Sequence, residues 1–419
     1  MPAITTSVLK NGMPLHRIAM TGTGSVTLLV AFDAGARTER PEENGMAHFL
    51  EHLVFKGGEK YPNYRAINEA AERNGAVINA YTSHDLVAFH ITARSLKARE
   101  AADLLTDYVA RPALNQEELD RERGVVVQEI ARYNDQPSSV AEHLIDEAVF
   151  GNHPLGRPVL GTTEHLSKTF TRDGIVAFRE RQWLPERGTA LAVGNLEQLG
   201  PDSGLEELFE RFSVSGNPTP YEPAPALAPR ILVTERESNQ SHLRMSYKPS
   251  IDPTDAAQRA ALIIYSTLLG GSMGSRLFDE IREQRGLCYS VSSYPHVYAD
   301  VPVLQLSSGL ESGKCVEAYR RMGEIVTELR DDGPTDAEVE RARAFAAGAR
   351  AIAFENTGAI ARTAATQAIV FGEPVDPDAT IAQLDAVTFD QVREVAAGIS
   401  VEYSVACVGP HTVSEFEPA

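Results

Sequence analysis

Apolar and polar residues follow one another along this chain in patterns that predict a mixture of strands and helices. Short apolar runs typical of buried strands occupy residues 25–35, 87–93, 242–249 and 303–310, and strands ending in glycine are expected within 189–195 and 403–409. Amphipathic stretches with helical periodicity cover about residues 96–111 and 255–269, and longer ones begin near Gln116, after Gly313 and after Thr335. Mixed strands and helices of this kind indicate an α+β fold.

The order of these predicted elements occurs twice, which indicates two similar units. The stretch EELDRERGVVVQEIARYND, from Glu117, aligns with the stretch from Ala337 at an offset of 220, and AVFGNHPL aligns with IVFGEPV at an offset of 221. Residues 216–230 are rich in proline and alanine and predict an extended linker. We therefore expect two structurally similar repeats, each a mostly antiparallel sheet packed with helices, in domains 1–215 and 231–419.

Composition places the chain among globular proteins and argues against two classes of partner. Hydrophobic residues make up 43% of the 419 positions, enough for more than one core. Lys plus Arg total 39 against 58 Asp plus Glu, which gives a formal net charge of −19. This balance argues against nucleic acid and anionic membranes, and acids lining a cavity would attract basic ligands. A soluble acidic surface explains most of the charge more simply.

The cysteine content and the lack of a long apolar segment indicate the cellular compartment in which the protein is expected. The three cysteines, Cys288, Cys315 and Cys407, form no C-x-x-C or similar metal pair and exclude a disulfide framework, which fits a reducing compartment. The amino-terminal residues have no signal-peptide or transit-peptide pattern, and no apolar stretch approaches membrane-spanning length. We expect a cytoplasmic protein.

The sequence AHFLEHLVFKG, residues 47–57, places two histidines and a carboxylate on one predicted helix. Residues four apart on a helix point the same way, so His48 and His52 can hold one ion between them. Glu51 lies on the adjoining edge of that face, where its carboxylate can reach a water on the same ion. This is the H-x-x-E-H arrangement. A half-buried helix with solvated histidines fits the same five residues, so a further ligand has to be found elsewhere.

Two acids on the long helical stretch that follows are candidates for that ligand. Glu129 is flanked by valines and an isoleucine, and a carboxylate among such neighbours is costly to bury without a cation or donor. Glu122, seven residues earlier, lies on the same face but also fits an ordinary charged surface. At the offset of 220 these acids correspond to Ala349 and Ala342, and the second half has no histidines at the equivalent place. Such asymmetry is expected if these residues perform chemistry.

Four motifs occur along the chain in the order HFLEH from His48, GAVINAYTSHD from Gly75, RERGVVVQEI from Arg121 and GGSMGSRLFDEIREQRGLCYSV from Gly270. Together they resemble the motifs of the pitrilysin/insulinase family of zinc peptidases, and within it the short two-domain branch similar to the catalytic subunit of mitochondrial processing peptidase. The resemblance covers about residues 5–410. The last motif lacks the longer glycine-rich loop of the inactive partner subunits, so the chain resembles the catalytic partner more closely.

The resemblance implies a Zn²⁺ site in domain 1–215. By this resemblance His48, His52 and Glu129 would bind the ion, Glu51 would be the general base, and Glu122 would support the site from behind the ligands. Zinc bound by two histidines and a glutamate is a known catalytic arrangement.

The resemblance also implies substrate-binding residues. The strand that contains NAYTS would offer its backbone edge to an extended substrate, which makes Asn79 and Ala80 the candidates there. Arg282 and Tyr289 match in spacing an arginine and a tyrosine that the second, non-catalytic domain supplies to the substrate. Without the resemblance, Arg282 would be one charge among many and Tyr289 a core aromatic.

The sequence therefore predicts a zinc-dependent endopeptidase that cleaves unfolded or extended peptides, basic ones among them. Because the halves of this family close like a clamshell, we expect a homodimer, or a heterodimer with a related inactive chain. Two alternatives remain open: a non-catalytic structural or scaffold subunit of the same fold, and a dedicated maturation peptidase for one peptide.

Overall fold

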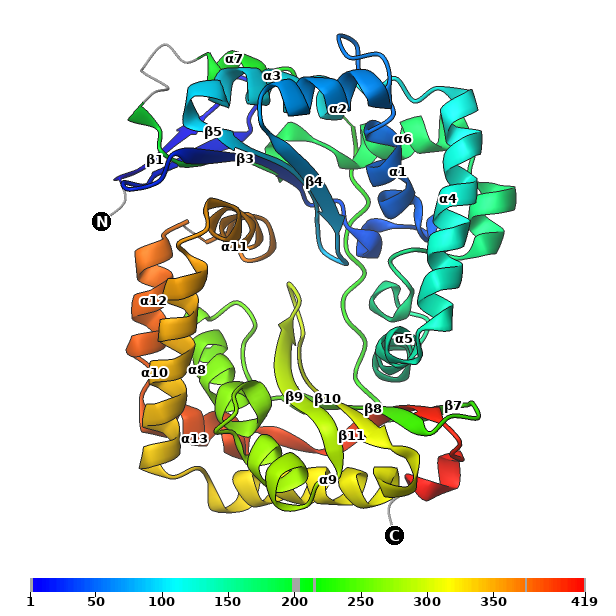
Figure 1. The fold of residues 1–419 in the computed structure, drawn as a ribbon, viewed down its shortest axis with the longest axis vertical. Helices are drawn as coiled ribbons and strands as arrows, with labels where there is room; N and C mark the ends of the chain where they lie inside the picture. Colours follow the sequence, from blue (N-terminus) through cyan, green and yellow to red (C-terminus); the bar gives the residue numbers. More distant parts are fainter. Residues whose placement is uncertain (1–2, 198–203, 214–215, 374, 418–419) are drawn as a thin grey trace. The chain divides into compact units, whose positions relative to one another are not determined.

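The computed structural model describes residues 3–197, 204–213, 216–373 and 375–417, which form two compact units. The first unit consists of Met1–Ile130, Pro158–Glu222 and Ala353–Asp378, and the second of Ala131–Arg157, Pro223–Ile352 and Ala379–Ala419. Each unit contains one sheet with helices packed on it (Figure 1). The predicted α+β fold of two sheet-and-helix repeats is confirmed.

The first unit is built on a six-stranded sheet. Its order is β1 (Ala3–Val8), β2 (Pro14–Ala19), β6 (Gly188–Gly194), β3 (Ser25–Phe32), β5 (Val87–Arg94) and β4 (Val77–Thr82). Neighbouring strands are antiparallel except β2 and β6, which are parallel. The predicted apolar runs correspond to β3, β5 and β6, and β4 lies at one edge of the sheet.

Helices cover both faces of this first sheet. They are α1 (Met46–Val54), α2 (Tyr64–Arg73), α3 (Ala98–Ala110), the first part of α4 (Gln116–Asp135), α6 (Arg172–Gln182), α7 (Leu205–Phe209) and α11 (Thr357–Val370). Alternate residues of a strand point to opposite faces. Leu28 of β3 therefore joins the apolar core with α1 and α3, while the Thr27 hydroxyl lies 2.8 Å from the Thr357 hydroxyl of α11. Figure 1 shows α3 and α11 on opposite sides of the sheet.

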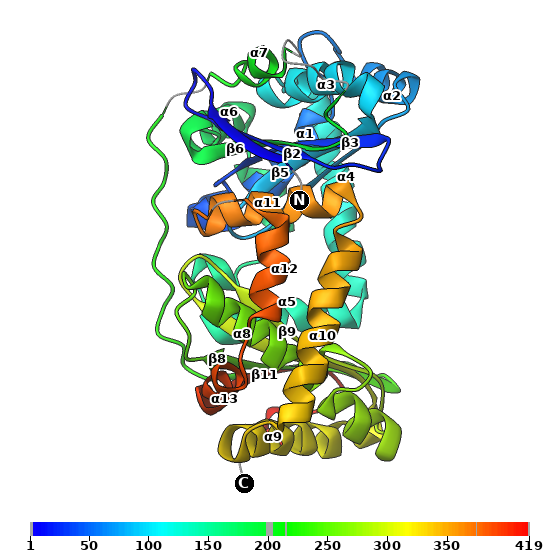
Figure 2. The same ribbon diagram turned by 90° about the vertical axis from the view of Figure 1, so that its left-hand side faces the viewer.

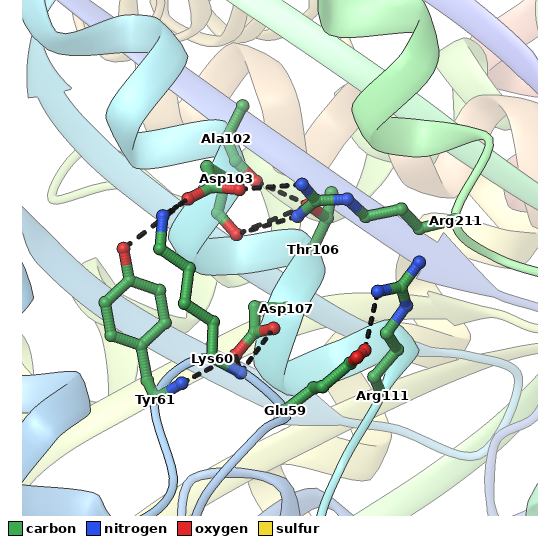
Figure 3. Close-up of polar contacts among 9 residues, drawn as sticks. All are labelled: Glu59, Lys60, Tyr61, Ala102, Asp103, Thr106, Asp107, Arg111 and Arg211. Carbon is green, nitrogen blue, oxygen red and sulfur yellow. Dashed lines mark hydrogen bonds and ion pairs between the residues drawn. The ribbon is translucent and has the colours of Figure 1, made fainter.

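The loop after α1 is held against α3 by a buried carboxylate (Figure 3). Asp107 accepts hydrogen bonds from the backbone nitrogens of Lys60 and Tyr61, each at 3.1 Å. Gly58 is required beside it, because a Cβ there would lie 2.3 Å from Oδ2 of Asp107. Asp103, one turn earlier in α3, forms an ion pair with the Lys60 ammonium. These contacts fix the end of α1, which carries the H-x-x-E-H sequence.

The second unit is built on a five-stranded sheet in the order β7 (Ile231–Glu235), β11 (Ile399–Gly409), β8 (Gln240–Pro249), β10 (Pro302–Glu311) and β9 (Cys288–Val297). Only β7 and β11 are parallel neighbours. One face packs on α5 (Pro137–Phe150). The other face belongs to a larger core with α8 (Ala256–Ser266), α9 (Cys315–Asp332), α10 (Asp336–Ala353), α12 (Pro377–Asp385) and α13 (Phe389–Ala397). In Figure 2, as in Figure 1, α9 lies below this sheet.

Each sequence repeat contributes one helix to the compact unit that is built mainly from the other repeat. Helices α4 and α5 start at residues 116 and 137, and α10 and α11 start at residues 336 and 357, so both pairs differ by 220. Yet α5 contacts β8 and β11 of the second unit, and α11 contacts β3 and β6 of the first. The sequence repeats and the compact units therefore divide the chain differently. Residue 215, the predicted end of the first domain, lies outside the described residues.

The segment predicted to be a linker contains neither helix nor strand over residues 216–230. The division between the two units, after Glu222, falls within it. Within the described part of the chain, no helix combines the length and the apolar character that crossing a membrane would need.

Candidate metal centre

Helix α1 begins against a buried carboxylate. Glu39, which is 4% exposed, accepts hydrogen bonds from the backbone nitrogens of Ala47 at 2.7 Å and Gly45 at 2.9 Å. These are N–H groups at a helix start that have no partner within the helix. Gly45 has φ of 95°, and a Cβ there would lie 2.6 Å from Cα of Gly161, so only glycine fits. Burial raises the pKa of Glu39 to about 8, although the two backbone hydrogen bonds lower it.

His48 and His52 stand one turn apart on the same face of α1, with ring centroids 4.6 Å apart. Glu129 approaches them from α4. Its Oε2 lies 3.3 Å from Nε2 of His52 and 3.8 Å from Nε2 of His48. One potential ligand atom from each of the three residues lies within 4.8 Å of the other two. The structure thus brings together the three side chains that the sequence suggested as metal ligands.

Glu122 orients the second histidine from the side away from Glu129. Its Oε1 lies 2.9 Å from Nδ1 of His52, and its Oε2 lies 2.6 Å from Nζ of Lys56. Burial would raise the pKa of Glu122, but the hydrogen bonds with His52 and Lys56 outweigh it and hold the pKa below its ordinary value. When His52 donates from Nδ1, its Nε2 presents a lone pair toward Glu129. Lys56 was not among the residues singled out in the sequence, although it stands four positions after His52.

The donor set fits zinc. Burial, with a smaller effect of His52, lowers the pKa of His48 to about 3, so its imidazole is neutral and a nitrogen lone pair is available. Two imidazoles and one carboxylate form the His₂Glu set of catalytic zinc sites, which leave a fourth position open. Mg²⁺ and Ca²⁺ prefer sets made of oxygen ligands. The residues His48, His52 and Glu129 therefore suit Zn²⁺ better than these harder ions.

Glu51 lies beside this ligand group. Its Oε2 accepts a hydrogen bond of 2.5 Å from the hydroxyl of Thr82, the last residue of β4. Burial raises the pKa of Glu51 and the charge of Glu129 adds to this, whereas Thr82 and His52 act in the opposite direction. A carboxyl group whose pKa is raised can take up a proton and release it again. Thr82 falls within the GAVINAYTSHD motif, but no property of the sequence pointed to its hydroxyl.

The strand β4, which contains Asn79 and Ala80, has a partner on one side only. Asn79 pairs with His90 and Ala80 with Phe89 of β5, and β4 ends the sheet on its other side. The backbone nitrogen of Ala80 donates 2.9 Å to the side-chain oxygen of Asn79. This N–H is therefore held by the strand's own side chain, as is expected of a group on an edge that lacks a neighbouring strand.

Arg282 and Tyr289 lie in the second unit and contact each other. Arg282 belongs to a π-helical segment, Phe278–Gln284, and Tyr289 to β9. The guanidinium carbon of Arg282 lies 4.5 Å from the ring centroid of Phe278 and 5.7 Å from that of Tyr289. Tyr289 is 84% exposed, so it is no core aromatic. The role of this pair toward a substrate stays a prediction.

The fold and the cluster define a class: two-repeat α+β chains with a His₂Glu candidate zinc centre in the first repeat. Family models match in both repeats, "Insulinase (Peptidase family M16)" over residues 18–163 and "Peptidase M16 inactive domain" over residues 169–345. The Uncharacterized zinc protease YmxG of Bacillus subtilis is 31% identical over 387 residues, which cover 92% of this chain and 93% of the relative. The chain therefore belongs to the insulinase family of peptidases, family M16.

Other relatives agree with this assignment. The Uncharacterized zinc protease Rv2782c of Mycobacterium tuberculosis is 29% identical, covering 92% of this chain and 89% of the relative. A peptidase M16 inactive domain from Pseudomonas fluorescens superposes with a TM-score of 0.88 at 18% identity over 98% of this chain and 99% of the other. A chain of complex III2 from Candida albicans superposes with a TM-score of 0.84 at 13% identity over 99% of both chains. At such identities the solved structures show the fold alone.

Proposed function

We propose that the protein is a zinc-dependent endopeptidase that hydrolyses bonds within unfolded or extended peptides. The observation that carries the proposal is the convergence of His48, His52 and Glu129, with Glu51 beside them and outside the ligand group. A structural zinc site is usually closed by four protein ligands, whereas three ligands with an adjacent acid suit a site that activates water. The zinc proteases among the relatives support the same class of reaction.

Each side chain has a distinct part in the proposed reaction. When bound, the ion supplies Lewis-acid activation of water and of the scissile carbonyl. Glu51 takes the proton from the attacking water and gives it to the leaving amine nitrogen, while the Thr82 hydroxyl holds the carboxyl in place. Glu122 keeps His52 in the orientation that ligation needs.

The substrate class follows from the exposed edge of β4. An extended peptide can add to such an edge as a further strand, with backbone hydrogen bonds that do not depend on its sequence. On binding, the Ala80 N–H would donate its hydrogen bond to a peptide carbonyl oxygen in place of the Asn79 side chain. Unfolded or extended chains present unpaired backbone groups along their length, so they are the preferred substrates. Arg282 and Tyr289 are proposed to contact the substrate as well.

The partners proposed are basic peptides and a second chain of the same fold, either a copy of this one or a related inactive chain. The formal charge of −19 would raise the local concentration of peptides that carry Lys or Arg. That attraction should weaken with salt, since the Debye length falls from about 10 Å at 0.1 M to about 3 Å at 1 M. The charge attraction is tested by the ratio of kcat/KM for a basic peptide to that for its neutral analogue, measured over this range of salt. Association with a second chain is tested by the particle mass from light scattering.

The decisive experiment measures zinc content together with hydrolysis of a quenched peptide, before and after chelation and after zinc is restored. We expect activity that chelation removes and zinc returns. Glu129→Ala should lose activity and the zinc bound at this centre, whereas Ala349→Glu, at the equivalent position of the other repeat, should add neither zinc nor activity. Glu117→Gln, an exposed acid of the same helix, is the matched control and should retain both. Wild-type protein that binds zinc but cleaves no peptide would favour a scaffold subunit.

A further inference from the structure

A second group of metal-ligating side chains lies in the other compact unit. Cys315 is the first residue of α9, Cys407 lies in β11, and His411 follows that strand by two residues. Both cysteines are fully buried and His411 is 6% exposed. One potential ligand atom from each lies within 4.8 Å of the other two. Cys288, the remaining cysteine, is at the start of β9 and takes no part in the group.

A directed chain of hydrogen bonds fixes the tautomer of His411. The Ser312 hydroxyl donates to the carbonyl oxygen of Ser238 at 2.8 Å, and the Ser241 hydroxyl donates to Ser312 at 3.0 Å. Since the single proton of Ser241 is used in this way, its oxygen must accept from Nε2 of His411, which lies 2.8 Å away. The neutral ring therefore carries its proton on Nε2. Its Nδ1 is left as a bare acceptor.

This bare nitrogen is buried and has no hydrogen-bond partner among the described residues. The Glu415 carboxylate is close to it, with Oε1 at 3.5 Å from Nδ1 of His411. A lone pair and a carboxylate oxygen repel each other unless a cation or a proton lies between them. The backbone is also adapted to this approach, because a Cβ at Gly409 would lie 2.4 Å from Oγ of Ser241 and 3.2 Å from the His411 ring.

We propose that Cys315, Cys407 and His411 bind a structural zinc ion, with the Glu415 carboxylate as the fourth ligand. Two sulfurs, one imidazole nitrogen and one carboxylate oxygen form a closed tetrahedral set of the kind that structural zinc sites use, and thiolate ligands exclude Mg²⁺ and Ca²⁺. The ligand atoms of Cys315, Cys407 and His411 lie within 4.8 Å of one another, and Zn–S bonds of about 2.3 Å and Zn–N bonds of about 2.0 Å require them to move closer together when the ion binds.

The ion would hold the end of the chain to the second sheet. His411 and Glu415 lie after β11, in a segment that is otherwise fastened by buried Phe416, whose carbonyl oxygen accepts a hydrogen bond of 2.8 Å from Tyr319. Zinc would add bonds from this segment to α9 and β11. This inference does not rest on the proposed peptidase activity, since the two groups share no residue.

The test is the zinc stoichiometry of the purified full-length protein, measured by elemental analysis after dialysis. We expect two equivalents in the wild type and in the control Cys288→Ser. One equivalent should remain after His48→Ala with His52→Ala, and one after Cys315→Ser with Cys407→Ser. If instead the wild type and the histidine double variant both hold one equivalent, the peptidase centre fails and the second site stands. A histidine double variant without zinc overturns the second site.

Cobalt substitution of the histidine double variant gives a readout that does not depend on mutating the cysteines. Co²⁺ bound by Cys315 and Cys407 should show thiolate-to-cobalt charge-transfer absorption, and His411→Gln should weaken it. Absence of that absorption overturns the proposal even if the cysteine variants fail to fold. Detection of a Cys315–Cys407 disulfide in the unreduced protein by mass spectrometry would also overturn it, because oxidised sulfurs do not bind zinc as thiolates.

Discussion

Nδ1 of His52 lies 2.9 Å from Oε1 of Glu122, and this contact decides which ring nitrogen faces Glu129. The same carboxylate also binds the Lys56 ammonium, at 2.6 Å from its other oxygen. One buried acid therefore positions a histidine and is itself held by a lysine. From these contacts we expect Glu122 to position His52 and not to bind the ion itself.

Replacement of Glu122 should weaken zinc binding in a graded way. Glu122→Ala removes the acceptor for Nδ1 of His52, and we expect zinc affinity to fall about 10- to 100-fold. Glu122→Gln keeps an oxygen acceptor and should lose less. Zinc affinity measured by competition with a chelator checks the order, and equal losses in both variants would show that charge, not the hydrogen bond, is what matters.

Glu51→Gln should abolish most hydrolysis while zinc content stays at the wild-type level. The amide oxygen of glutamine still accepts from Thr82, but the side chain can no longer take a proton, a function worth about 10²- to 10⁴-fold in rate. Peptide hydrolysis and elemental analysis of the same preparation check both parts. Near-normal turnover in Glu51→Gln would show that Glu51 is not the general base.

Glu39→Gln should destabilise the first unit. Both carboxylate oxygens of Glu39 accept N–H groups at the start of α1, and an amide NH₂ would face a donor with a donor. An unsatisfied buried polar group costs about 1–3 kcal/mol. Thermal unfolding measured above the raised Glu39 pKa of about 8, where this carboxylate is ionised, should therefore shift to lower temperature, whereas Glu42→Gln, on an exposed neighbour in the same segment, should leave it unchanged. No shift in Glu39→Gln would show that the start of α1 is held by other contacts.

Asp146 should make the stability of the second unit depend on pH. Burial raises the pKa of this α5 carboxyl from 3.8 to about 7, with Glu142 adding to the effect and the hydrogen bond from Gln305 and the charge of Arg244 opposing it. The folded state thus binds the proton more tightly than the unfolded state. The contribution of Asp146 to the free energy of unfolding is therefore complete below about pH 4. It is lost as the pH rises to about 7, and this loss amounts to at most about 4 kcal/mol.

Asp146→Asn keeps an acceptor for Gln305 and removes the ionisation. The variant should resemble the wild type near pH 4 and be more stable at pH 8, as measured by urea unfolding at both values. Glu147→Gln, an exposed neighbour on α5, is the control and should keep the wild-type pH dependence. A wild-type stability that does not fall between these pH values would contradict the assignment.

The sequence predicted best what depends on local periodicity. The spacing of His48 and His52 predicted one shared helix face, and the offset of 220 predicted the repeat, because both properties are carried by the backbone geometry of single helices. Lys56, Thr82 and Glu39 were missed because their importance comes from contacts outside their own helix, strand or turn. Lys56 contacts Glu122, which is 66 positions distant, Thr82 contacts Glu51, which is 31 positions distant, and Glu39 contacts the start of α1.

The group around Cys315 was missed for the same physical reason. A search for closely spaced cysteines cannot find ligands that lie on a helix start and on the last strand of the sheet. The packing of α5 and α11 was also beyond the sequence, since the residue patterns of these two helices do not say which sheet they cover. Fold class depended on pattern, but the assignment of helices to sheets depended on tertiary contacts.

The exchange of α5 and α11 has a consequence for how this protein is made. The sheet that supports the candidate zinc centre has one face covered by α11, and that helix starts at Thr357 of a 419-residue chain. During synthesis the first sheet must therefore wait, with that face open, until most of the polypeptide has left the ribosome. A fragment that stops at the proline-rich segment would lack α11 and keep this face of the sheet uncovered. The two repeats can therefore be distinguished in the sequence, but we do not expect them to fold independently.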